Sequence, residues 1–210
     1  MQLTVVNQWL LKPWAKPLCW LVCAVPAVAL LVGAATGQLG ANPAEKLIRE
    51  TGEWALRWLW LTLAISPLRE LAALPALLRY RRALGVSAFA YALLHFLAYA
   101  WLDKGLVIDD IVRDVLKRNF ILVGVLGLLL ITPLALTSFN AAIRKLGGRR
   151  WQMLHKLVYA VALLGLLHFY WKKSAKNDVG EVMVYAVILA VLLGWRAMRK
   201  GGVMAMLRVR

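Results

Sequence analysis

The sequence predicts an all-α integral membrane protein, a single bundle of six transmembrane helices that occupies the whole of residues 1–210. Hydrophobic residues make up 62% of the chain, whereas a soluble domain carries about 45–50%. The mean hydropathy is +0.68, and the apolar residues gather in long runs between short basic segments. The excess apolar surface therefore faces lipid, and the length suits one bundle rather than two domains.

The individual spans follow from the need for about 20 apolar residues to cross the hydrocarbon core. The first run is longer than the apolar segment of a signal peptide and is followed by more such runs, so we expect it to be retained. The second is short and contains Arg57, which we expect to snorkel towards the nearer interface. The six predicted spans cover approximately residues 18–36, 52–68, 83–102, 119–140, 151–171 and 181–197.

Lysine and arginine set the predicted orientation. With six spans both termini lie on one side, and that side receives sixteen of the 26 basic residues. Nine of the ten acidic residues fall on the other side, with Glu70 as the exception. The excess of positive charge places both termini in the cytoplasm. The net charge of +16 does not indicate nucleic acid, because the basic residues lie between apolar runs, where anionic lipid is their natural partner.

Two smaller patterns accompany the spans. The motifs Ile65–Leu68 (ISPL) and Ile131–Leu134 (ITPL) each precede a basic turn and then a histidine-bearing helix, which is a weak sign of an internal repeat. Residues 103–118 combine apolar residues at helical spacing with several aspartates, which predicts a short amphipathic helix on the outer interface. This segment is either a connector or a docking surface for an external partner.

All three histidines of the chain, His95, His155 and His168, fall inside predicted spans. Ionisable groups at membrane depth are costly and usually functional. A bare metal site would require Cys, Asp or Glu nearby, and a proton path would also favour acidic partners. No acidic residue lies within the histidine-bearing spans. Neutral imidazoles in a helical bundle instead suit haem, whose iron takes axial histidines.

Depth along the helices indicates how the histidines pair. His155 and His168 are thirteen residues apart, about 20 Å along a straight helix, so they cannot share one iron. His95 and His168 both lie near the outer ends of their spans, which favours these two as a bis-histidine pair. His155 lies nearer the cytoplasmic side, and it faces the same partner helix as His168 only if the helix is kinked, for example near Gly165.

Several segments resemble the MsrQ (YedZ) family of bacterial haem-binding membrane subunits. The sequence KLGGRRWQMLHKLVY of residues 145–159, followed by His168, carries this resemblance, as does RYRRALG of residues 79–85 leading to His95. The resemblance covers nearly the whole chain. It implies a bundle of the ferric-reductase-like transmembrane type, related to the membrane part of NADPH oxidases, in the inner membrane of a bacterium.

The resemblance also implies a function. Members of the family bind b-type haem, are associated with FMN, and serve the periplasmic methionine sulfoxide reductase system. They pass electrons from the cytoplasmic side to MsrP, a periplasmic molybdenum enzyme that reduces oxidised methionine in proteins. The family's haem histidines match His95, His155 and His168. On this basis the chain is expected to be an electron-carrying subunit with no substrate-reducing site of its own.

One departure concerns the number of haems. NADPH oxidases carry a further histidine upstream of the one matching His95, and this sequence has Arg81 and Arg82 there. His155 is then alone at the inner position, so one haem is expected and a second is left open. Because no nucleotide-binding domain follows the last predicted span, electrons are expected from a membrane quinone or a separate cytoplasmic flavin reductase.

Charged groups at the two faces complete the predictions. The cytoplasmic arginines could hold the phosphate of FMN or haem propionates, or they could serve membrane topology alone. At the outer face, the aspartates of residues 103–118 could steer a basic partner. A small ion or proton transporter and a cofactor-free membrane anchor stay open as alternatives. The arginines are Arg79, Arg81, Arg82, Arg149 and Arg150, and the aspartates are Asp109, Asp110 and Asp114.

Overall fold

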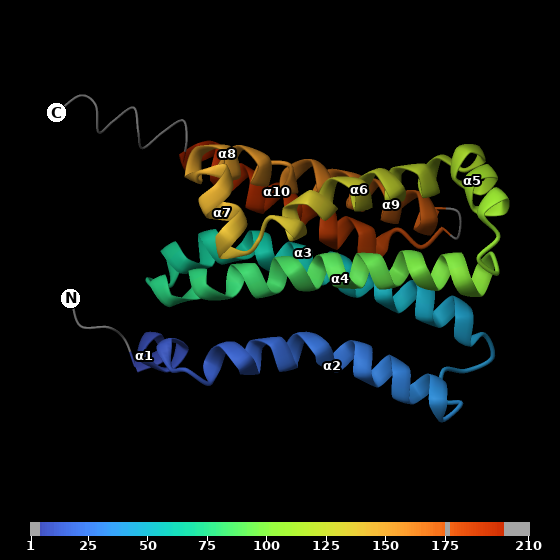
Figure 1. Cartoon of the computed structure of the whole chain (residues 1–210), viewed down its shortest axis with the longest axis horizontal. Coiled ribbons are helices and arrows are strands. Elements are labelled where there is room, and N and C mark those ends of the chain that lie inside the picture. The colour runs from blue at the N-terminus through green and yellow to red at the C-terminus, as the bar shows by residue number, and fades with distance from the viewer. Residues whose placement is uncertain (1–4, 175–176, 200–210) are drawn as a thin grey trace.

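The computed structural model describes residues 5–174 and 177–199, and all regular structure within these ranges is helical, which confirms the all-α prediction. Long helices run side by side along the long axis of the molecule (Figure 1). These are α2 (Ala15–Ala35), α3 (Pro43–Leu71), α4 (Arg81–Ala98), α6 (Asn119–Leu136), α9 (Val158–Ser174) and α10 (Gly180–Met198). Shorter elements join them: α1 (Val5–Leu11), the 3₁₀ helix η1 (Pro75–Tyr80), the π-helix η2 (Tyr99–Asp103), α5 (Ile108–Lys117), α7 (Asn140–Leu146) and α8 (Gly148–His155).

Five segments in the described part of the chain are long and apolar enough to cross a membrane. They contain α2, α4, α6, α9 and α10 and correspond to five of the predicted spans. The remaining long helix, α3, does not qualify, because charged residues, Glu53 and Arg57 among them, occupy its first half and only the second half is a continuous apolar run. The guanidinium of Arg57 donates to Glu53 and to the Tyr185 hydroxyl of α10, and its snorkelling towards an interface stays a prediction.

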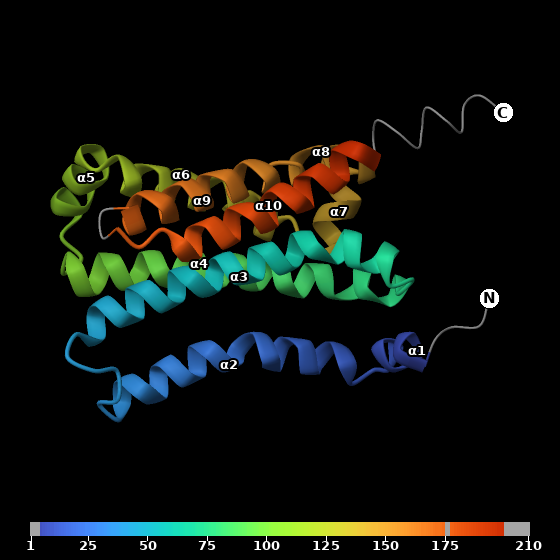
Figure 2. The same ribbon diagram turned by 180° about the vertical axis from the view of Figure 1, so that it is seen from behind.

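The core consists of two helix pairs, because α3 packs most closely against α4 and α6 against α9. Leu63 of α3 and Ala162 of α9 are fully buried between the pairs. Helix α10 covers α9 and α3, while α2 lies at the periphery (Figure 2). The histidine-bearing helices α4 and α9 therefore each have a dedicated neighbour, α3 and α6.

The two ends of the bundle differ. Helix α1, η1, α7, α8 and the end of α10 lie at one end, which we call the terminal end (Figure 1). The other end carries α5 and the connections between α2 and α3 and between α9 and α10, and we call it the α5 end. The described ends of the chain thus lie on the same side of the bundle.

The proline of the ISPL motif has a structural partner. Pro67 lies inside α3 and lacks an N–H, so the carbonyl of Leu63, four residues earlier, loses its helical donor. The guanidinium of Arg196 on α10 donates to this carbonyl. In the ITPL motif, Pro133 likewise lies near the end of α6. The proline in α3 is therefore compensated by a cation from another helix.

Tyr91 attaches the peripheral helix α2 to α4. Its hydroxyl accepts a hydrogen bond from the N–H of Ala27 (2.8 Å) and donates to the carbonyl of Cys23 (2.8 Å). Ala27 and Cys23 are four residues apart on α2, so the hydroxyl is inserted into the helical hydrogen-bond ladder next to Pro26. The Tyr91 side chain is only 3% exposed. This contact joins two helices that otherwise meet only loosely.

The predicted span over residues 151–171 is not one helix. Helix α8 ends at His155 and α9 begins at Val158, with two turn residues between them. The kink therefore follows His155 directly, and the suggested position near Gly165 is wrong. Gly165 serves packing instead, since a Cβ there would lie 3.1 Å from Leu56 of α3. The break frees His155 from the orientation of His168.

Candidate functional site

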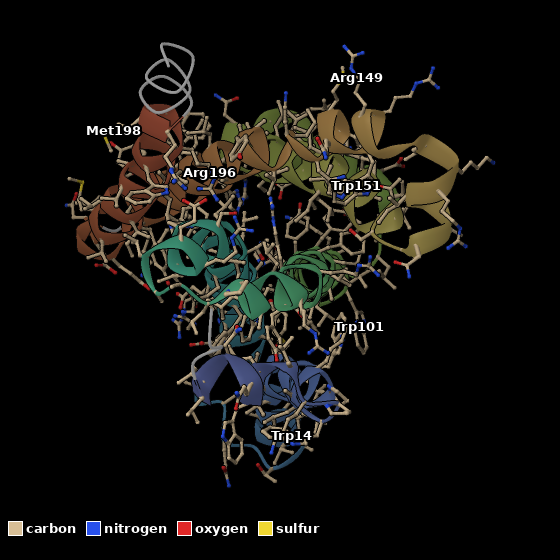
Figure 3. All side chains as sticks on the ribbon, turned by 90° about the vertical axis from the view of Figure 1, so that its left-hand side faces the viewer. Trp14, Trp101, Arg149, Trp151, Arg196 and Met198 are labelled. Atoms are coloured by element: carbon tan, nitrogen blue, oxygen red, sulfur yellow. The ribbon has the colours of Figure 1, made fainter. Side chains whose placement is uncertain are left out.

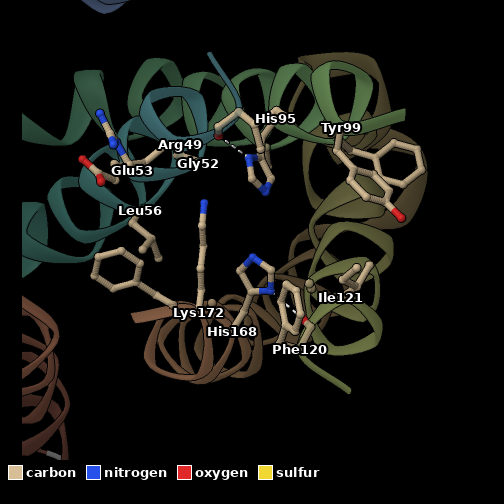
Figure 4. A pocket seen from close by; sticks show the side chains of 18 of the residues that line it. Arg49, Gly52, Glu53, Leu56, His95, Tyr99, Phe120, Ile121, His168 and Lys172 are labelled. Atoms are coloured by element: carbon tan, nitrogen blue, oxygen red, sulfur yellow. Dashed lines mark hydrogen bonds between the residues drawn. The ribbon is translucent and has the colours of Figure 1, made fainter. Parts of the chain in front are cut away.

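His95 and His168 face each other across the space between the two helix pairs. Their ring centroids are 6.0 Å apart and their planes are inclined by 78°. His95 projects from α4 and His168 from α9, and the two rings point toward one another in Figure 4. The pairing predicted from depth along the helices therefore agrees with the arrangement of the folded chain.

A backbone carbonyl fixes the orientation of each ring. Nδ1 of His95 lies 2.6 Å from the carbonyl oxygen of Ile48 on α3, and Nδ1 of His168 lies 2.6 Å from that of Phe120 on α6. Because a carbonyl can only accept, Nδ1 carries the proton in both rings. Each Nε2 is left with a lone pair directed into the space between the helices. This is the arrangement usual for metal-ligating histidines, in which the second nitrogen donates to a carbonyl or carboxylate.

Two glycines make room for the rings. A Cβ placed on Gly52 would lie 2.9 Å from Nδ1 of His95, and one on Gly124 would lie 2.8 Å from Nδ1 of His168. Real Cβ atoms do not approach that closely, so any larger residue would displace the imidazole. Each glycine follows the accepting carbonyl by one helical turn, Gly52 after Ile48 and Gly124 after Phe120.

The two halves of the site are built alike. In each pair, the histidine of the second helix bonds to a carbonyl of the first, 47 residues earlier for His95 and 48 for His168. These carbonyls and glycines were not predicted from the sequence. The available signal was a glycine one turn after an apolar residue in the helix before each histidine helix, which is too common a pattern to be selective.

The histidines line a cavity of about 700 Å³ near the α5 end. Most of its wall is apolar, with Leu56, Leu59 and Ile131 among the buried contributors. Charged residues line its rim, and Figure 4 shows Lys172 extending from α9 past the histidine pair towards α3. The cavity volume lies in the range usual for cofactor pockets, about 300–1,000 Å³.

The geometry fits a metal held between the two imidazoles. With each metal–nitrogen bond at about 2 Å, the ring centres of two axial histidines lie about 6 Å apart, as they do here. In the described residues no group of three or more His, Cys, Asp or Glu side chains is placed to hold a metal ion. Two opposed imidazoles with an apolar cavity around them therefore suit a metal whose other ligands come from a macrocycle, which is the situation in bis-histidine haem.

His155 lies apart from this pair, at the terminal end. Its ring stacks on Trp151 with centroids 3.9 Å apart, and its Nδ1 lies 3.0 Å from the Trp151 carbonyl. Nε2 is buried and has no hydrogen-bond partner in the described structure. The Leu134 carbonyl and the Arg81 guanidinium lie near the ring but outside hydrogen-bonding geometry. An orphaned buried nitrogen of this kind is suited to ligation.

The five arginines predicted to cluster near His155 do not form one group. Arg79 and Arg82 line a second cavity at the terminal end, while Arg81 lies near His155. Arg149 and Arg150 are exposed on α8, and Figure 3 shows Arg149 pointing outward, on the far side of the molecule from Trp14. The sequence placed all five at one end of the bundle but could not resolve their separation around its circumference.

Residues 103–118 contain the short helix α5, as the amphipathic pattern predicts. Asp114, however, does not belong to an exposed acidic patch. It is buried, accepts hydrogen bonds from the Tyr99 hydroxyl (2.8 Å) and Lys104 Nζ (3.0 Å), and pairs with Arg118. Burial alone would raise the pKa of Asp114, but these hydrogen bonds and the charge of Arg118 outweigh it, and the pKa lies below its usual value. The hydrogen bond to Asp114 in turn raises the pKa of Lys104. Asp114 thus fastens α5 to the π-helix that follows the His95 helix.

Comparisons with known proteins identify a matching family model and several similar proteins. A family model described as ferric reductase like transmembrane component matches residues 51–166. A protein-methionine-sulfoxide reductase heme-binding subunit MsrQ from Polaromonas naphthalenivorans is 56% identical over 190 residues, covering 90% of this chain and 87% of its own. The MsrQ subunit of Ralstonia nicotianae is 48% identical, with 88% of each chain covered, and that of Azospira oryzae is 50% identical, with 88% of this chain and 79% of its own covered. No solved structure matches the chain.

The helical bundle and the matched residues define a ferric-reductase-like transmembrane protein, in which two helix pairs face each other through one histidine each. Within that class, relatives that are 48% and 56% identical over most of their length identify the family. The chain belongs to the MsrQ family.

Proposed function

We propose that the protein binds b-type haem between His95 and His168 and is the electron-carrying membrane subunit of a protein-methionine-sulfoxide reductase system. The observation that carries the proposal is the opposed pair of imidazoles, each with Nδ1 bonded to a carbonyl and Nε2 free to ligate. A relative that is 56% identical is named as a heme-binding subunit. Haem bound there would supply a one-electron carrier inside the bilayer.

The residues of the chain would prepare the site before the cofactor arrives. The carbonyls of Ile48 and Phe120 hold the imidazoles in one tautomer, so the ligating lone pairs need no reorganisation. The apolar wall excludes water and lowers the local dielectric, which tunes the potential of a bound metal. Lys172 at the rim would lie within reach of a cofactor carboxylate.

We also propose six membrane crossings with both termini cytoplasmic. Helix α3 runs the length of the bundle beside the five apolar spans, and the described chain ends share one side. The terminal end carries most of the basic residues, in accord with the positive-inside rule. The charged pair Glu53 and Arg57 is neutralised within the bundle, which reduces the cost of placing α3 across the membrane.

In this orientation His155 lies near the cytoplasmic donor and the His95–His168 pair near the periplasmic acceptor. We propose that a membrane quinone or a flavin reductase supplies electrons and that the periplasmic molybdoprotein MsrP receives them. The orphaned Nε2 of His155 is the candidate ligand for a second haem. FMN, implied by the family resemblance, would be held by its phosphate at the exposed arginines of α8, Arg149 and Arg150, because Arg79 and Arg82 lie apart from them at the second cavity.

The proposed docking surface for the periplasmic partner is the α5 end. Asp109 and Asp110 are exposed on the first turn of α5, whereas Asp114 is engaged internally. Two exposed carboxylates would steer a basic partner surface. Charge reversal at these two positions should slow electron delivery to the acceptor without changing the cofactor, and an unchanged rate and salt dependence would rule this surface out.

The visible spectrum of the purified protein tests the central proposal. The wild-type protein should show a reducible Soret band and sharp α bands typical of low-spin haem. His95→Ala and His168→Ala should each abolish the low-spin spectrum, because one axial ligand is lost. His155→Ala is the matched control and should leave the His95–His168 haem intact. A normal low-spin haem in either His95→Ala or His168→Ala would refute the pairing.

A further inference from the structure

A second cavity, of about 330 Å³, opens at the terminal end of the bundle. Its wall draws on four elements: α2 contributes Lys16, η1 contributes Leu78 and Arg79, α4 contributes Arg82, and α7 contributes Asn140. Three cationic side chains and one amide therefore converge from segments that are far apart in the sequence. No carboxylate belongs to the lining.

The positive charge of this cavity is not neutralised within the part of the chain that the structure describes. None of Lys16, Arg79 and Arg82 has a carboxylate within ion-pair distance there. The two guanidinium groups are nevertheless held in place. Arg79 donates to the carbonyl of Leu10 (3.2 Å) and Arg82 to the amide oxygen of Asn140 (2.8 Å). Each contact uses one of the five N–H donors of a guanidinium, so several donors remain for an anion.

Three like charges converging in one cavity repel each other unless an anion binds between them. Planar guanidinium groups match the oxygen atoms of a phosphate, and a lysine adds a compact point charge. We propose that this cavity is a phosphate-binding site formed by Lys16, Arg79, Arg82 and Asn140, and that the phosphate belongs to the headgroup of an anionic phospholipid.

The depth of the cavity identifies the lipid headgroup as the source. Trp9 on α1 and Trp14 just before α2 have ring centroids 5.8 Å apart and are 52% and 46% exposed. Tryptophans that are exposed at one level of a membrane protein mark the interface where the headgroups lie. Lys12 sits over the Trp9 ring at 4.3 Å, as expected for a cation at that level. Basic pockets between transmembrane helices on the cytoplasmic side are known sites for anionic headgroups.

The structural role of such a lipid follows from where the lining residues come from. Helix α2 lies at the periphery, makes few contacts with α3, α4 and η1, and is hydrogen-bonded to α4 through Tyr91. A headgroup bound by Lys16 of α2, Arg82 of α4 and Asn140 of α7 would fasten this end of α2 to α4 and α7. The site is distinct from the histidine cavity, and the inference does not depend on the proposed redox function.

The test measures lipid retention in the full-length protein. Protein reconstituted with phosphatidylglycerol or with phosphatidylcholine is extracted in mild detergent, and the bound lipid is counted by native mass spectrometry. The wild type should retain phosphatidylglycerol and not phosphatidylcholine. The triple variant Lys16→Gln, Arg79→Gln, Arg82→Gln should lose affinity for phosphatidylglycerol by roughly 100-fold, since each cation contributes about 1 kcal/mol. Arg149→Gln, Arg150→Gln is the matched control and should retain the lipid.

Two further measurements keep the inference falsifiable. Lys16→Gln alone should fold normally, because Lys16 contributes no described hydrogen bond, and should still weaken retention about fivefold. Inorganic phosphate and FMN are added separately as competitors to distinguish the sources of the phosphate. Equal retention in the wild type and the triple variant, or equal retention of the two lipids, would overturn the site. Loss of FMN from the variants with phosphatidylglycerol unaffected would overturn the lipid as its occupant.

Discussion

Replacing Gly124 by alanine is the sharpest test of how the histidine site is built. The new Cβ would lie 2.8 Å from Nδ1 and 2.9 Å from Cε1 of His168, whereas ordinary contacts begin at 3.4 Å. The ring must therefore move by 0.2 Å to reach 3.0 Å, below which real Cβ atoms essentially never approach, and by 0.6 Å to restore an ordinary contact at 3.4 Å. Metal–ligand distances tolerate only about 0.2 Å, so the displaced Nε2 cannot keep its position against His95.

The expected loss follows from the groups that are disturbed. The shift stretches the hydrogen bond between His168 Nδ1 and the Phe120 carbonyl, now 2.6 Å, and misdirects the ligating nitrogen. Changes to groups that orient metal ligands typically cost 10–100-fold in affinity, and we expect a loss of haem affinity in that range. The helix itself should persist, because alanine is a better helix former than glycine by about 1 kcal/mol.

The assay compares haem content and the low-spin spectrum of purified Gly124→Ala with those of Gly127→Ala. Gly127 lies one turn further along α6, and a Cβ there would meet only Leu164 at 3.8 Å, an ordinary contact. Gly127→Ala should therefore match the wild type, and Gly124→Ala should lose haem or become high-spin. If Gly124→Ala retains a low-spin haem with unchanged affinity, the glycine does not position His168.

Three further predictions concern the scaffold. Tyr91→Phe should lower the free energy of unfolding by about 1–3 kcal/mol, because Ala27 N–H and the Cys23 carbonyl lose their bridge, while the haem spectrum stays unchanged. Asp114→Asn should loosen α5 and increase its amide hydrogen exchange. Because the folded-state pKa of Asp114 is lowered, the stability that this carboxylate contributes is present above about pH 4 and is lost as the pH falls through the folded-state pKa. Arg196→Gln should cost about 1–3 kcal/mol by leaving a backbone carbonyl without its donor, and adding Pro67→Ala should recover part of that loss.

Each of these predictions has a clear contrary result. Thermal unfolding of Tyr91→Phe at the wild-type temperature would show that the inserted hydroxyl contributes nothing. An Asp114→Asn protein with unchanged exchange in α5 at neutral pH would remove the proposed attachment. For Arg196 the double variant decides: equal stability changes with and without Pro67→Ala would mean that the two residues are not coupled.

The helical architecture could be predicted from the sequence, and so could the placement of His95 and His168 opposite each other. Both conclusions depend on quantities that a linear pattern carries well, namely the length of an apolar run and depth along a helix. The number of membrane-spanning helices was harder to predict from the sequence. Helix α3 contains Glu53 and Arg57, which neutralise each other as an i,i+4 pair, while the further hydrogen bond from Arg57 to Tyr185 of α10 joins residues that are far apart in the sequence.

The parts that could not be predicted depend on rotation around helix axes and on contacts between distant segments. The break after His155 has no proline or glycine to mark it, and it uncouples the orientation of that ring from the orientation of His168. Arg149 and Arg79 are both basic residues at the terminal end, yet only Arg79 reaches a cavity. Asp114 is indistinguishable in sequence from Asp109 until Tyr99 and Lys104 are placed beside it.

Each histidine makes its orienting hydrogen bond within its own helix pair, α4 to α3 and α9 to α6. The consequence concerns biogenesis. The first pair can enter the bilayer and set its imidazole before the second has left the ribosome, and the second can do the same independently. Neither pair needs the other to shape its ligand. A cofactor joining the two would then act as the final assembly step, selecting those molecules in which both halves have been inserted correctly.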